Sequence, residues 1–425
     1  MKLKVTFCAY DSPDTLGGPV SWLQRLLPSL RSRGVESRCL FLTWGNANTG
    51  PTLTALRAQG FNCAAASYHN HTCDSVRWIL KELCTEPPDV FVPSLMVAAY
   101  YASRWVREAG IPTVGILFAP DSFYSGLEDA FAFGAKRFRL SGIVGVSRAL
   151  EARVLARNPQ NLVVRRIPCG VPVFPARVVR NPSILRLAYV GRLVEEAKRI
   201  SDLTHALCRA VREVPGTAAV LYGDGPDRAA VKSIIETEGG DGSVRLAGRF
   251  ANSDQVQRRL IECDVLVLLS DYEGLPVALL EGMACGCVPV CLRIPGGVSE
   301  LVEDEVTGLL VEDRGNSFVT AIRRLQTEPG LWQRLSRAAR TKIEAGYSIE
   351  RCADQWAEFL STLHAGRGPK RPIKLPRHIK LPPPHPDLAR HDPRPCRPPF
   401  PLRFYRRSRI LAGRIKRQFL GLPIS

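Results

Sequence analysis

The amino-acid sequence predicts an α/β protein with two doubly wound domains, and three observations lead to this prediction. Short β-rich runs bounded by turns alternate with helical stretches, which is typical of parallel sheets covered by helices on both faces. The alternation stops once, at the aperiodic and proline-rich stretch 168–182, and then begins again. The chain of 425 residues is also too long for one typical hydrophobic core.

The first predicted domain covers residues 1–180. Its opening strand, "KLKVTFC", is followed by "GPVSWLQRLLPSLRSRG", in which apolar residues recur at helical spacing and Gly34 suits a helix C-cap. The other strands expected in this domain are "SRCLFLTW", "DVFVPS", "IPTVGILFA" and "GIVGVS". This order of strands and helices indicates a parallel sheet.

The second predicted domain covers residues 181–345. Its expected strands are "ILRLAYVG", "AAVLYGDG", "VRLAG", "CDVLVLLS", "VPVCL" and "GLLV". The stretches "SFVTAIRRLQ" and "GLWQRLSRAARTKIEAG" are expected to be helices of the same domain. Residues 346–364 have the amphipathic pattern of a final helix.

Residues 365–425 differ from the rest of the chain in composition. They hold 16 Lys and Arg against 2 Asp and Glu, a net charge of +14, whereas residues 1–364 carry only +4. Many prolines and few apolar residues predict a disordered, extended tail. Its last stretch, "LRFYRRSRILAGRIKRQFLGL", is either a short helix on an anionic membrane surface or a solvated tail. Because the basic charge lies in the tail, nucleic acid is an unlikely partner of the folded part.

The sequence also bears on where the protein works. The apolar run at the N-terminus is too short for a signal peptide, and no run reaches the roughly 18–20 apolar residues of a membrane span. The 13 cysteines are scattered, and several, such as Cys8 and Cys291, lie in apolar runs where a thiol packs as a small hydrophobe. We therefore expect a cytoplasmic protein, with peripheral attachment to a membrane through the tail as a further prediction.

The segment "LLSDYEGLPVALLEGMACGCVPV" carries the strongest functional pattern. It predicts a strand, "VLVLLS", a turn, "DYEGLP", that contains Gly274, and a helix, "VALLEGMACG". Unbonded amides at the start of such a helix suit an anion or sugar hydroxyls. Glu273 precedes that end, and Glu281 lies on the helix among apolar residues. A carboxylate buried there needs a partner, and either the vicinal diol of a ribose or a neighbouring arginine would serve.

Two other turns of the second domain carry groups suited to a phosphate. "GRLVEEAKRI" places Arg192 and Lys198 after a strand, where two cations can neutralise a diphosphate, although solvated surface cations give the same pattern. "GDGP" places Gly223 and Gly225 at a strand-to-helix turn. Arg228 stands where a dinucleotide-binding fingerprint needs its third glycine, which favours an ordinary tight turn beside a ligand.

Together these segments resemble the retaining GT-B glycosyltransferases of family 4 (glycosyl transferases group 1). Glu273 and Glu281 are similar to the E-x7-E motif of that family. The other matching segments, in family order, are "GGPVSWLQRLL", "IVGVS", "IPCGV", "GRLVEEAKRI", "GDGP" and "PGGVSELVEDEVTGLLV". The resemblance covers most of Met1–His364 and implies a GT-B fold, in which two Rossmann-like domains face a central cleft.

The resemblance also implies an activity. Members of the family move a sugar, without a metal, from a UDP- or GDP-linked donor to a hydroxyl of a glycan, lipid-linked or small-molecule acceptor, as in polysaccharide or glycoconjugate biosynthesis. The anomeric configuration is retained, and the leaving diphosphate accepts the proton of the acceptor. No cofactor is implied beyond the donor substrate. A double-displacement reaction would need two facing carboxylates about 5 Å apart, which Glu273 and Glu281 do not provide if one helix covers both.

The resemblance assigns the donor to named residues. Arg192 and Lys198 would hold the diphosphate, Glu281 would bind the ribose, and Glu273 would contact the donor sugar together with the amides of Gly274 and Leu275. Arg192, Lys198 and Glu273 are thereby candidate catalytic residues. The Gly-rich turn with Gly223 and Gly225 and the loop with Gly17 and Gly18 would complete the donor site with backbone amides.

The acceptor side departs from the family pattern. Asp121 is a candidate catalytic residue that would contact the acceptor or the transferred sugar. Phe118 stands where many relatives carry a histidine near the acceptor. Two alternatives to an active transferase follow: a catalytically impaired protein that binds nucleotide-sugars, and a membrane-surface adaptor that acts through its basic tail.

Overall fold

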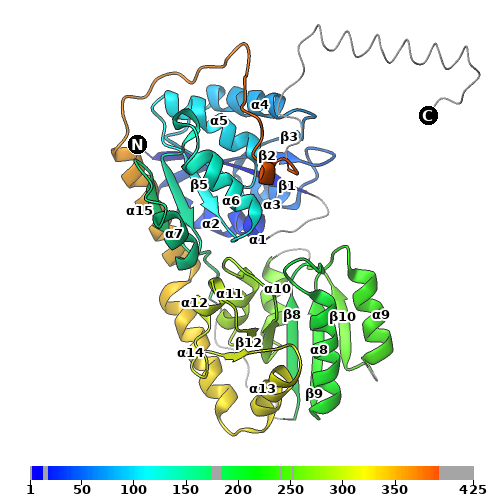
Figure 1. The fold of residues 1–425 in the computed structure, drawn as a ribbon. Helices are drawn as coiled ribbons and strands as arrows, with labels where there is room; N and C mark the ends of the chain where they lie inside the picture. The colour runs from blue at the N-terminus through cyan, green and yellow to red at the C-terminus, as the bar shows by residue number, and fades with distance from the viewer. Residues whose placement is uncertain (1, 13–17, 174–182, 240–241, 251–252, 392–425) are drawn as a thin grey trace, which may run out of the picture.

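The computed structural model describes residues 2–12, 18–173, 183–239, 242–250 and 253–391. It confirms the prediction of two doubly wound α/β domains, which lie end to end in Figure 1. Within the described residues, no helix combines the length and apolarity that crossing a membrane requires. Cys8 and Cys291 are buried in strands, as their apolar surroundings predict.

The N-terminal domain contains a parallel sheet. Four strands pair in the order β3-β2-β1-β4, an isolated bridge joins β4 to the residue before β5, and β5, β6 and β7 continue side by side. These strands are β1 (Leu3–Asp11), β2 (Val35–Thr43), β3 (Asn62–Ser67), β4 (Val90–Pro93), β5 (Val114–Leu117), β6 (Gly142–Gly145) and β7 (Val163–Arg166). Every residue of β4, β5 and β6 is buried, as expected for strands with helices on both faces.

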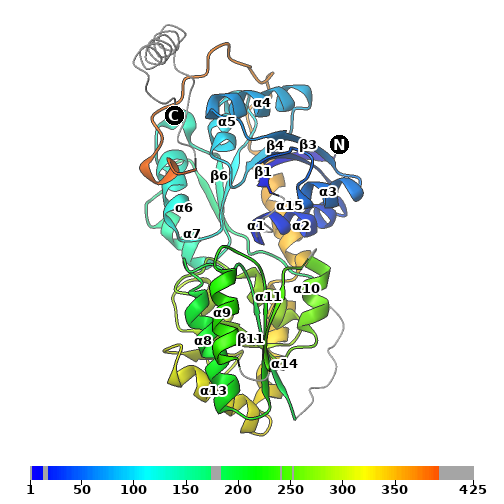
Figure 2. The ribbon, with the colours of Figure 1, turned by 90° about the vertical axis from the view of Figure 1, so that its right-hand side faces the viewer.

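The helices of this domain follow the strands in turn. They are α1 (Gly18–Ser21), α2 (Leu23–Arg31), α3 (Pro51–Ala58), α4 (Thr72–Thr85), α5 (Val97–Glu108), α6 (Ser122–Leu127) and α7 (Arg148–Leu155). A π-helical turn, η1 (Glu128–Ala132), and a 3-10 turn, η2 (Lys136–Phe138), extend the segment after α6. Figure 2 shows α1 and α2 on the side of the domain that meets the second domain.

The C-terminal domain has one parallel sheet with the order β10-β9-β8-β11-β12-β13. Its strands are β8 (Leu185–Val190), β9 (Thr217–Tyr222), β10 (Val244–Gly248), β11 (Val265–Leu268), β12 (Val288–Leu292) and β13 (Leu309–Val311). Its helices are α8 (Ile200–Glu213), α9 (Arg228–Glu238), α10 (Ser253–Leu260), α11 (Val277–Ala284), α12 (Gly297–Leu301), α13 (Asn316–Thr327) and α14 (Leu331–Gly346).

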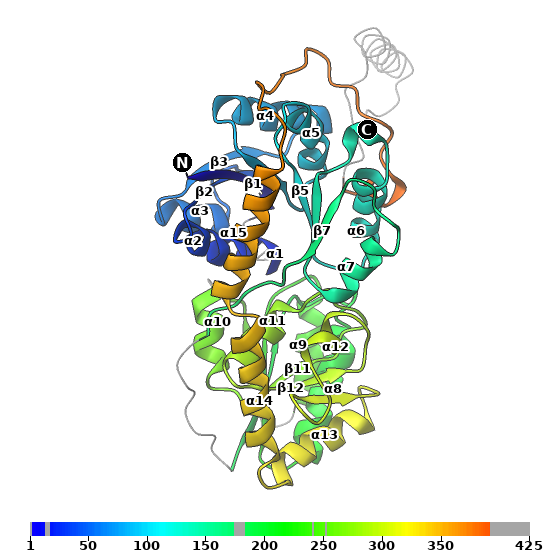
Figure 3. The same ribbon diagram turned by 90° about the vertical axis from the view of Figure 1, so that its left-hand side faces the viewer.

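The chain returns to the first domain after α14. Helix α15 (Ile349–Ala365) lies beside α2 in Figure 3, and its fully buried Trp356 packs against the rings of Phe7 and Trp22. The two segments that cross between the domains are paired, because the Val171 N–H donates to the carbonyl of Tyr347 at 3.1 Å. The amphipathic helix expected at 346–364 is therefore present and completes the core of the N-terminal domain.

The structure corrects the prediction of disorder for the first part of the tail. Residues 366–391, here called the C-terminal strap, follow a defined path over the N-terminal domain (Figure 1). Ile373, Ile379 and Leu388 are buried along it. The guanidinium of Arg77 donates to the carbonyls of Pro376 and Arg377 at 3.0 and 2.9 Å.

The composition of the strap wrongly predicts disorder. Its apolar side chains are too widely spaced to form a core of their own, but they are buried against the N-terminal domain. The 3-10 turn η3 (Pro386–Leu388) lies near the end of the strap. The final stretch, "LRFYRRSRILAGRIKRQFLGL", and residues 174–182 of the proline-rich stretch 168–182 lie outside the described residues.

Candidate functional site

Three loops follow neighbouring strands at the carboxyl edge of the second sheet. They cover residues 191–199 after β8, 223–227 after β9 and 269–276 after β11. Strand β8 pairs with β9 on one side and with β11 on the other. The order of the strands reverses at this point, and ligands of open parallel sheets bind where the loops diverge from such a reversal. The sequence-predicted site residues of the second domain lie on these loops and on α11.

Gly223 and Gly225 pack against the loop that follows β8. A Cβ atom on Gly223 would lie 1.9 Å from the carbonyl oxygen of Gly191, and one on Gly225 would lie 2.2 Å from that of Leu193. The Leu193 N–H also donates to the carbonyl of Asp224 at 3.0 Å. Only glycine permits two backbones to approach so closely. In this structure both glycines thus hold two loops of the site together.

Lys198 and Glu273 form an ion pair between the first and third loops. The Ser270 hydroxyl donates to the same carboxylate oxygen at 2.8 Å. Ala197 and Arg199, on either side of Lys198, have φ angles of 61° and 49°. This left-handed conformation is unfavourable for residues other than glycine. Backbone strain at two positions therefore accompanies the placement of Lys198 over Glu273.

Arg192 occupies the other end of the same loop and is exposed. Its carbonyl accepts a hydrogen bond from the Tyr189 hydroxyl at 2.8 Å. Its guanidinium makes no hydrogen bond or ion pair within the described part of the chain. Burial raises the pKa of Tyr10, at the end of β1, and the charge of Arg192 acts in the opposite direction. Arg192 thus lies across the domain boundary from Tyr10, with its charge available.

Helix α11 begins with a group of unbonded amides. The N–H groups of Gly274, Leu275, Val277 and Ala278 donate no hydrogen bond to a residue that the structure describes. The N-terminal amides of a helix have no partner within the helix and carry partial positive charge. The arrangement predicted from the sequence, unbonded amides directly after Glu273, is therefore present.

The N-terminal domain approaches this helix end at two places. A Cβ atom on Gly18 would lie 3.7 Å from the Cγ2 methyl of Val277. A Cβ atom on Gly274 would lie only 1.8 Å from the carbonyl oxygen of Phe118. The two domains are therefore in direct contact at the turn before α11. Gly17 lies outside the described residues.

Glu281 pairs with an arginine from the other domain. Its carboxylate accepts a hydrogen bond from the guanidinium of Arg25 on α2, and the two side chains are 6% and 8% exposed. Of the two partners considered for this carboxylate, the structure shows the arginine. The bond uses Oε1 of Glu281, and Oε2 has no hydrogen bond to a described residue. The Nη1 atom of Arg25 is buried without a partner in the same part of the chain.

A second carboxylate, Glu300 on α12, also binds across the domain boundary. It pairs with the guanidinium of Arg166 and accepts a hydrogen bond from the Arg148 N–H at 2.6 Å. The Tyr347 hydroxyl donates to it at 3.1 Å. Burial and the negative charge of Glu300 raise the pKa of Tyr347 to about 12. Sequence reasoning missed Glu300, although an acidic residue within the apolar run "GGVSELV" is the signal that marks it.

Asp121 has a structural role in the first domain. Its side chain accepts a hydrogen bond from the Tyr124 N–H at 3.0 Å and caps α6. Its carboxylate also lies near Tyr272 on the third loop. Burial raises the pKa of Tyr272, and the charges of Glu196, Asp121 and Glu273 raise it further. Asp121 is therefore brought close to the second domain.

The Phe118 side chain packs inside the N-terminal domain. The residue is 8% exposed, and its ring packs edge-on against Trp22 at 5.9 Å and at a tilt against Tyr124 at 6.3 Å between centroids. The side chain belongs to the core of the N-terminal domain. What Phe118 presents to the other domain is its backbone carbonyl, which faces Gly274.

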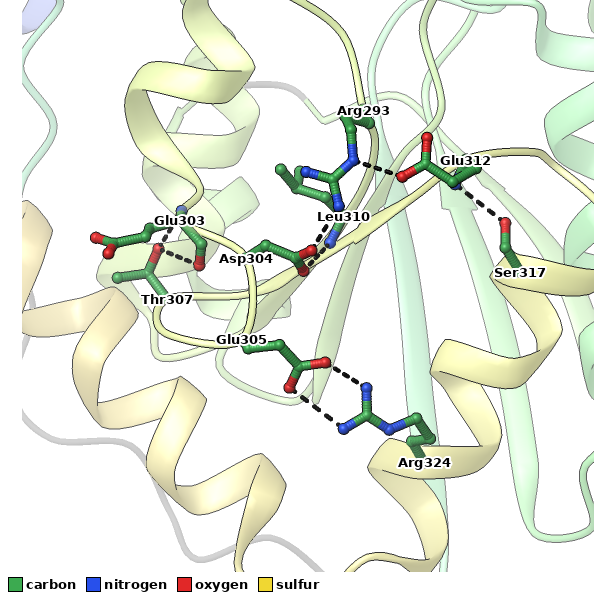
Figure 4. Close-up of polar contacts among 9 residues, drawn as sticks. All are labelled: Arg293, Glu303, Asp304, Glu305, Thr307, Leu310, Glu312, Ser317 and Arg324. Carbon is green, nitrogen blue, oxygen red and sulfur yellow. Dashed lines mark hydrogen bonds and ion pairs between the residues drawn. The ribbon is translucent and has the colours of Figure 1, made fainter.

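The acidic run 303–305 stabilises the loop between α12 and β13, as Figure 4 shows. Asp304 forms an ion pair with Arg293, and Glu305 forms one with Arg324. The carboxylates of both residues thus have partners within the second domain. The conspicuous acidic segment "VEDE" is explained by the structure of this loop.

Comparison with known proteins assigns a family to the second domain. Residues 185–328 match the family model described as "Glycosyl transferases group 1". The chain is 30% identical over 170 residues to the alpha-D-kanosaminyltransferase of Streptomyces kanamyceticus, a match over 40% of this chain and 43% of that protein. It is 31% identical over 187 residues to the amylovoran biosynthesis glycosyltransferase AmsK of Erwinia amylovora, over 42% and 45% of the two chains. These matches span less than half the length of either relative.

A longer match extends over parts of both domains. The chain is 27% identical over 325 residues to the putative colanic acid biosynthesis glycosyltransferase WcaL of Salmonella typhimurium, over 70% of this chain and 78% of that protein.

Solved structures extend the likeness to the whole fold. A structure of Anabaena HepE in complex with UDP superposes with a TM-score of 0.67 at 18% identity, over 85% of this chain and 100% of that one. A mutant of S. aureus TarM, in complex with fondaparinux, alpha-GlcNAc-glycerol and UDP, gives a TM-score of 0.65 at 14% identity, over 85% of this chain and 100% of that one. The chain therefore has the GT-B fold, and residues 185–328 of its C-terminal domain match the glycosyl transferases group 1 family.

Proposed function

We propose that the chain is a retaining glycosyltransferase that moves a sugar from a UDP- or GDP-linked donor to an acceptor hydroxyl. The observation that carries the proposal is the placement of the Lys198–Glu273 pair directly before the unbonded amides of α11. A cation, a carboxylate and a positive helix end at one edge of a sheet suit a sugar diphosphate.

The diphosphate is proposed to bind between Arg192 and Lys198. Both residues lie on the loop 191–199. The Arg192 side chain has no partner in the described part of the chain. In the reaction, negative charge grows on the leaving diphosphate. Cations held in place beforehand stabilise that charge, which is usually a large contribution to catalysis. The amides after Glu273 add to this stabilisation, so we propose that no metal ion is needed.

The ribose is proposed to bind Glu281 while the ion pair with Arg25 persists. One carboxylate oxygen is used by Arg25, and the other is open to a hydroxyl of the diol. Because a carboxylate has about four acceptor sites, it can bind the guanidinium and the diol together. Glu273 would then lie next to the donor sugar, and the backbone near Gly18 next to the phosphates.

Nucleotide binding is the first test of this proposal. UDP, GDP and ADP, and then their sugars, are screened for a rise in melting temperature, which a ligand of the folded state must produce above its Kd. We expect one nucleotide to raise it, and calorimetry to show weaker binding by Glu281→Gln. Glu236→Gln is the matched control, since Glu236 is exposed on α9. The absence of binding by UDP, GDP and ADP would overturn the proposal.

A second candidate, a nucleotide-sugar-binding protein without transfer, is favoured by one observation. The Phe118 ring lies in the core, so no polar side chain from this position reaches the acceptor side. Incubation with the bound donor and a broad acceptor panel separates the two candidates. Transfer with retained configuration, read from the anomeric signals of the product by NMR, supports the enzyme. Donor binding with neither transfer nor hydrolysis supports the second candidate.

Attachment to an anionic membrane is a separate proposal that rests on the +14 charge of residues 365–425. We expect the full chain to sediment with phosphatidylserine vesicles at low salt and to be released at high salt. No sedimentation at low salt would remove this proposal and leave the transferase proposal untouched.

A further inference from the structure

The end of the C-terminal strap crosses the carboxyl edge of the N-terminal sheet. Tyr68 follows β3 and Phe123 lies on α6, which follows β5, and these two strands lie on opposite sides of β1. His391 reaches both residues. Its carbonyl accepts a hydrogen bond from the Tyr68 hydroxyl at 3.4 Å, and its ring meets that of Phe123 at 4.5 Å between centroids. The strap thereby bridges the place where loops of the first sheet diverge.

The strap is fixed to α6 just before this crossing. Leu388 is completely buried, and a Cβ atom on Gly126 of α6 would lie 3.0 Å from the Cβ of Asp387. The Nε2 atom of His385 lies 3.4 Å from the carboxylate of Asp129. Figure 2 shows this part of the strap, in orange-red, beside α6. The segment is therefore packed against the helix that Asp121 caps.

An exposed aromatic surface adjoins the crossing. Trp44 follows β2 and stacks on Tyr68, with ring centroids 4.3 Å apart and an interplanar angle of 27°. It is 56% exposed, although most large apolar side chains among the described residues are buried. A single exposed aromatic residue is ordinary on a protein surface. Here the exposed ring stacks on a second ring at the carboxyl edge of a sheet.

Asp121 links this surface to the proposed donor site. Burial lowers the pKa of His391 in the strap, and the charge of Asp121 acts in the opposite direction. Burial also raises the pKa of Tyr272, in the loop that precedes α11, and the charges of Glu196 and Asp121 raise it further. Asp121 is thus within electrostatic reach of both the strap end and the donor loop. The HepE and TarM structures align over their whole length with 85% of this chain, so this chain has segments that they lack.

We propose that the acceptor is a saccharide whose pyranose ring stacks on Trp44, and that strap residues 385–391 form one wall of its subsite. The C–H face of a pyranose is apolar and packs on an aromatic face, while its hydroxyls remain free for polar partners. Asp121 and the backbone of the strap provide acceptors on the side toward the donor. This inference rests on the proposed function and selects a saccharide among the acceptors that the sequence left open.

The test measures saccharide binding separately from nucleotide binding. The full chain is loaded with the nucleotide that stabilises it, and methyl pyranosides of glucose, galactose, mannose and N-acetylglucosamine are titrated by NMR. At least one pyranoside is expected to bind. Trp44→Ala should weaken that binding at least tenfold, and Trp44→Phe should keep most of it. Leu155→Ala is the matched control, because Leu155 is similarly exposed, at 51%, on α7.

A chain that ends at Pro384 tests the wall formed by the strap. It should keep its nucleotide affinity and lose at least tenfold in pyranoside affinity. The inference is overturned if the nucleotide-loaded chain binds none of the pyranosides, or if Trp44→Ala and the shortened chain both bind them as the full chain does. A chain that binds no nucleotide contradicts the proposed function instead, so the two failures are distinguishable.

Discussion

Arg25 and Glu281 form a buried ion pair between the two domains, 256 positions apart in the sequence. Glu281 lies on the helix whose first turn is proposed to bind the donor, and Arg25 lies on α2 of the opposite domain. A carboxylate at this depth needs a partner at all times. The N-terminal domain supplies it, so the two domains share one of the groups proposed to bind the nucleotide.

Removing one member of this pair should be costly. Arg25→Met leaves Glu281 buried without a partner, and breaking a buried pair in this way typically costs about 3–5 kcal/mol. We expect a lower urea midpoint for Arg25→Met and a partial recovery when Glu281→Leu is added. Arg104→Met is the control, since the Arg104–Glu108 pair is exposed and should contribute less than about 1 kcal/mol. Equal midpoints for the two arginine variants would contradict this account.

A methyl group at Gly274 should push the domains apart. The Cβ of Gly274→Ala would lie 1.8 Å from the Phe118 carbonyl oxygen, so the contact between the domains cannot persist unchanged. Overpacking of this kind costs about 1–3 kcal/mol. We expect a lower melting temperature and a larger radius of gyration by X-ray scattering. Gly346→Ala, which meets nothing within 4 Å, should change neither; a Gly274→Ala protein with unaltered scattering would rule out a rigid contact here.

Lys198 should matter for transfer more than its position on a surface loop suggests. Under the proposed function it neutralises the leaving diphosphate, and loss of one such group lowers kcat by about 10²–10³-fold. We therefore expect Lys198→Met to reduce kcat/KM for the donor by about two orders of magnitude. Lys232→Met, at an exposed position on α9, should leave kcat/KM unchanged. A loss below about threefold for Lys198→Met would mean that this lysine only orients Glu273.

Acid should release the beginning of the strap. Burial raises the pKa of Asp89, but hydrogen bonds from the Lys4 N–H, Lys370 and Arg367 outweigh it and hold the pKa below its ordinary value of 3.8. The unfolded state therefore binds more protons in this range, and stability rises with pH. The contribution of Asp89 is complete above pH 3.8 and is lost as pH falls through the lower pKa of the folded protein.

Hydrogen exchange of the Arg371 amide can follow this release, because that amide donates to the Ala109 carbonyl at 2.8 Å. After correction for the intrinsic rate, its protection should fall in the natural chain as the pH is lowered below 3.8. Asp89→Asn should show low protection at every pH. Equal protection in both proteins at pH 5 would show that Asp89 does not hold the strap.

Much of the fold is readable from local patterns. Runs such as β11 are continuous in buried apolar residues and lie between turns, so their assignment needs no tertiary information. Strand β3 was missed because its sequence, "NCAAAS", has small residues and no fully buried position. Strand β7, "VVRR", was missed because exposed and partly exposed positions alternate along it. Both are peripheral strands whose assignment depends on the neighbour with which they pair.

The residues of the candidate site likewise fall into those that a local sequence pattern reveals and those that depend on the complete fold. The loop residues from Arg192 to Glu273 were found because glycines and charges after a strand form a local signal. The partners that cross between domains, Arg25 and Glu300, were not found, because each depends on a contact that only the complete fold brings together. The strap was misread because its apolar residues are sparse, and burial against a domain already formed does not require a dense pattern.

The return of α15 to the first domain has a consequence for how the chain is made. Trp356 fills the space between Phe7 and Trp22, so the N-terminal core lacks a central side chain until residue 356 has left the ribosome. The C-terminal domain, by contrast, is complete once α14 has emerged at Gly346. In topological terms it is an insertion within the other domain, and the half of the protein that is translated first is the half that finishes folding last.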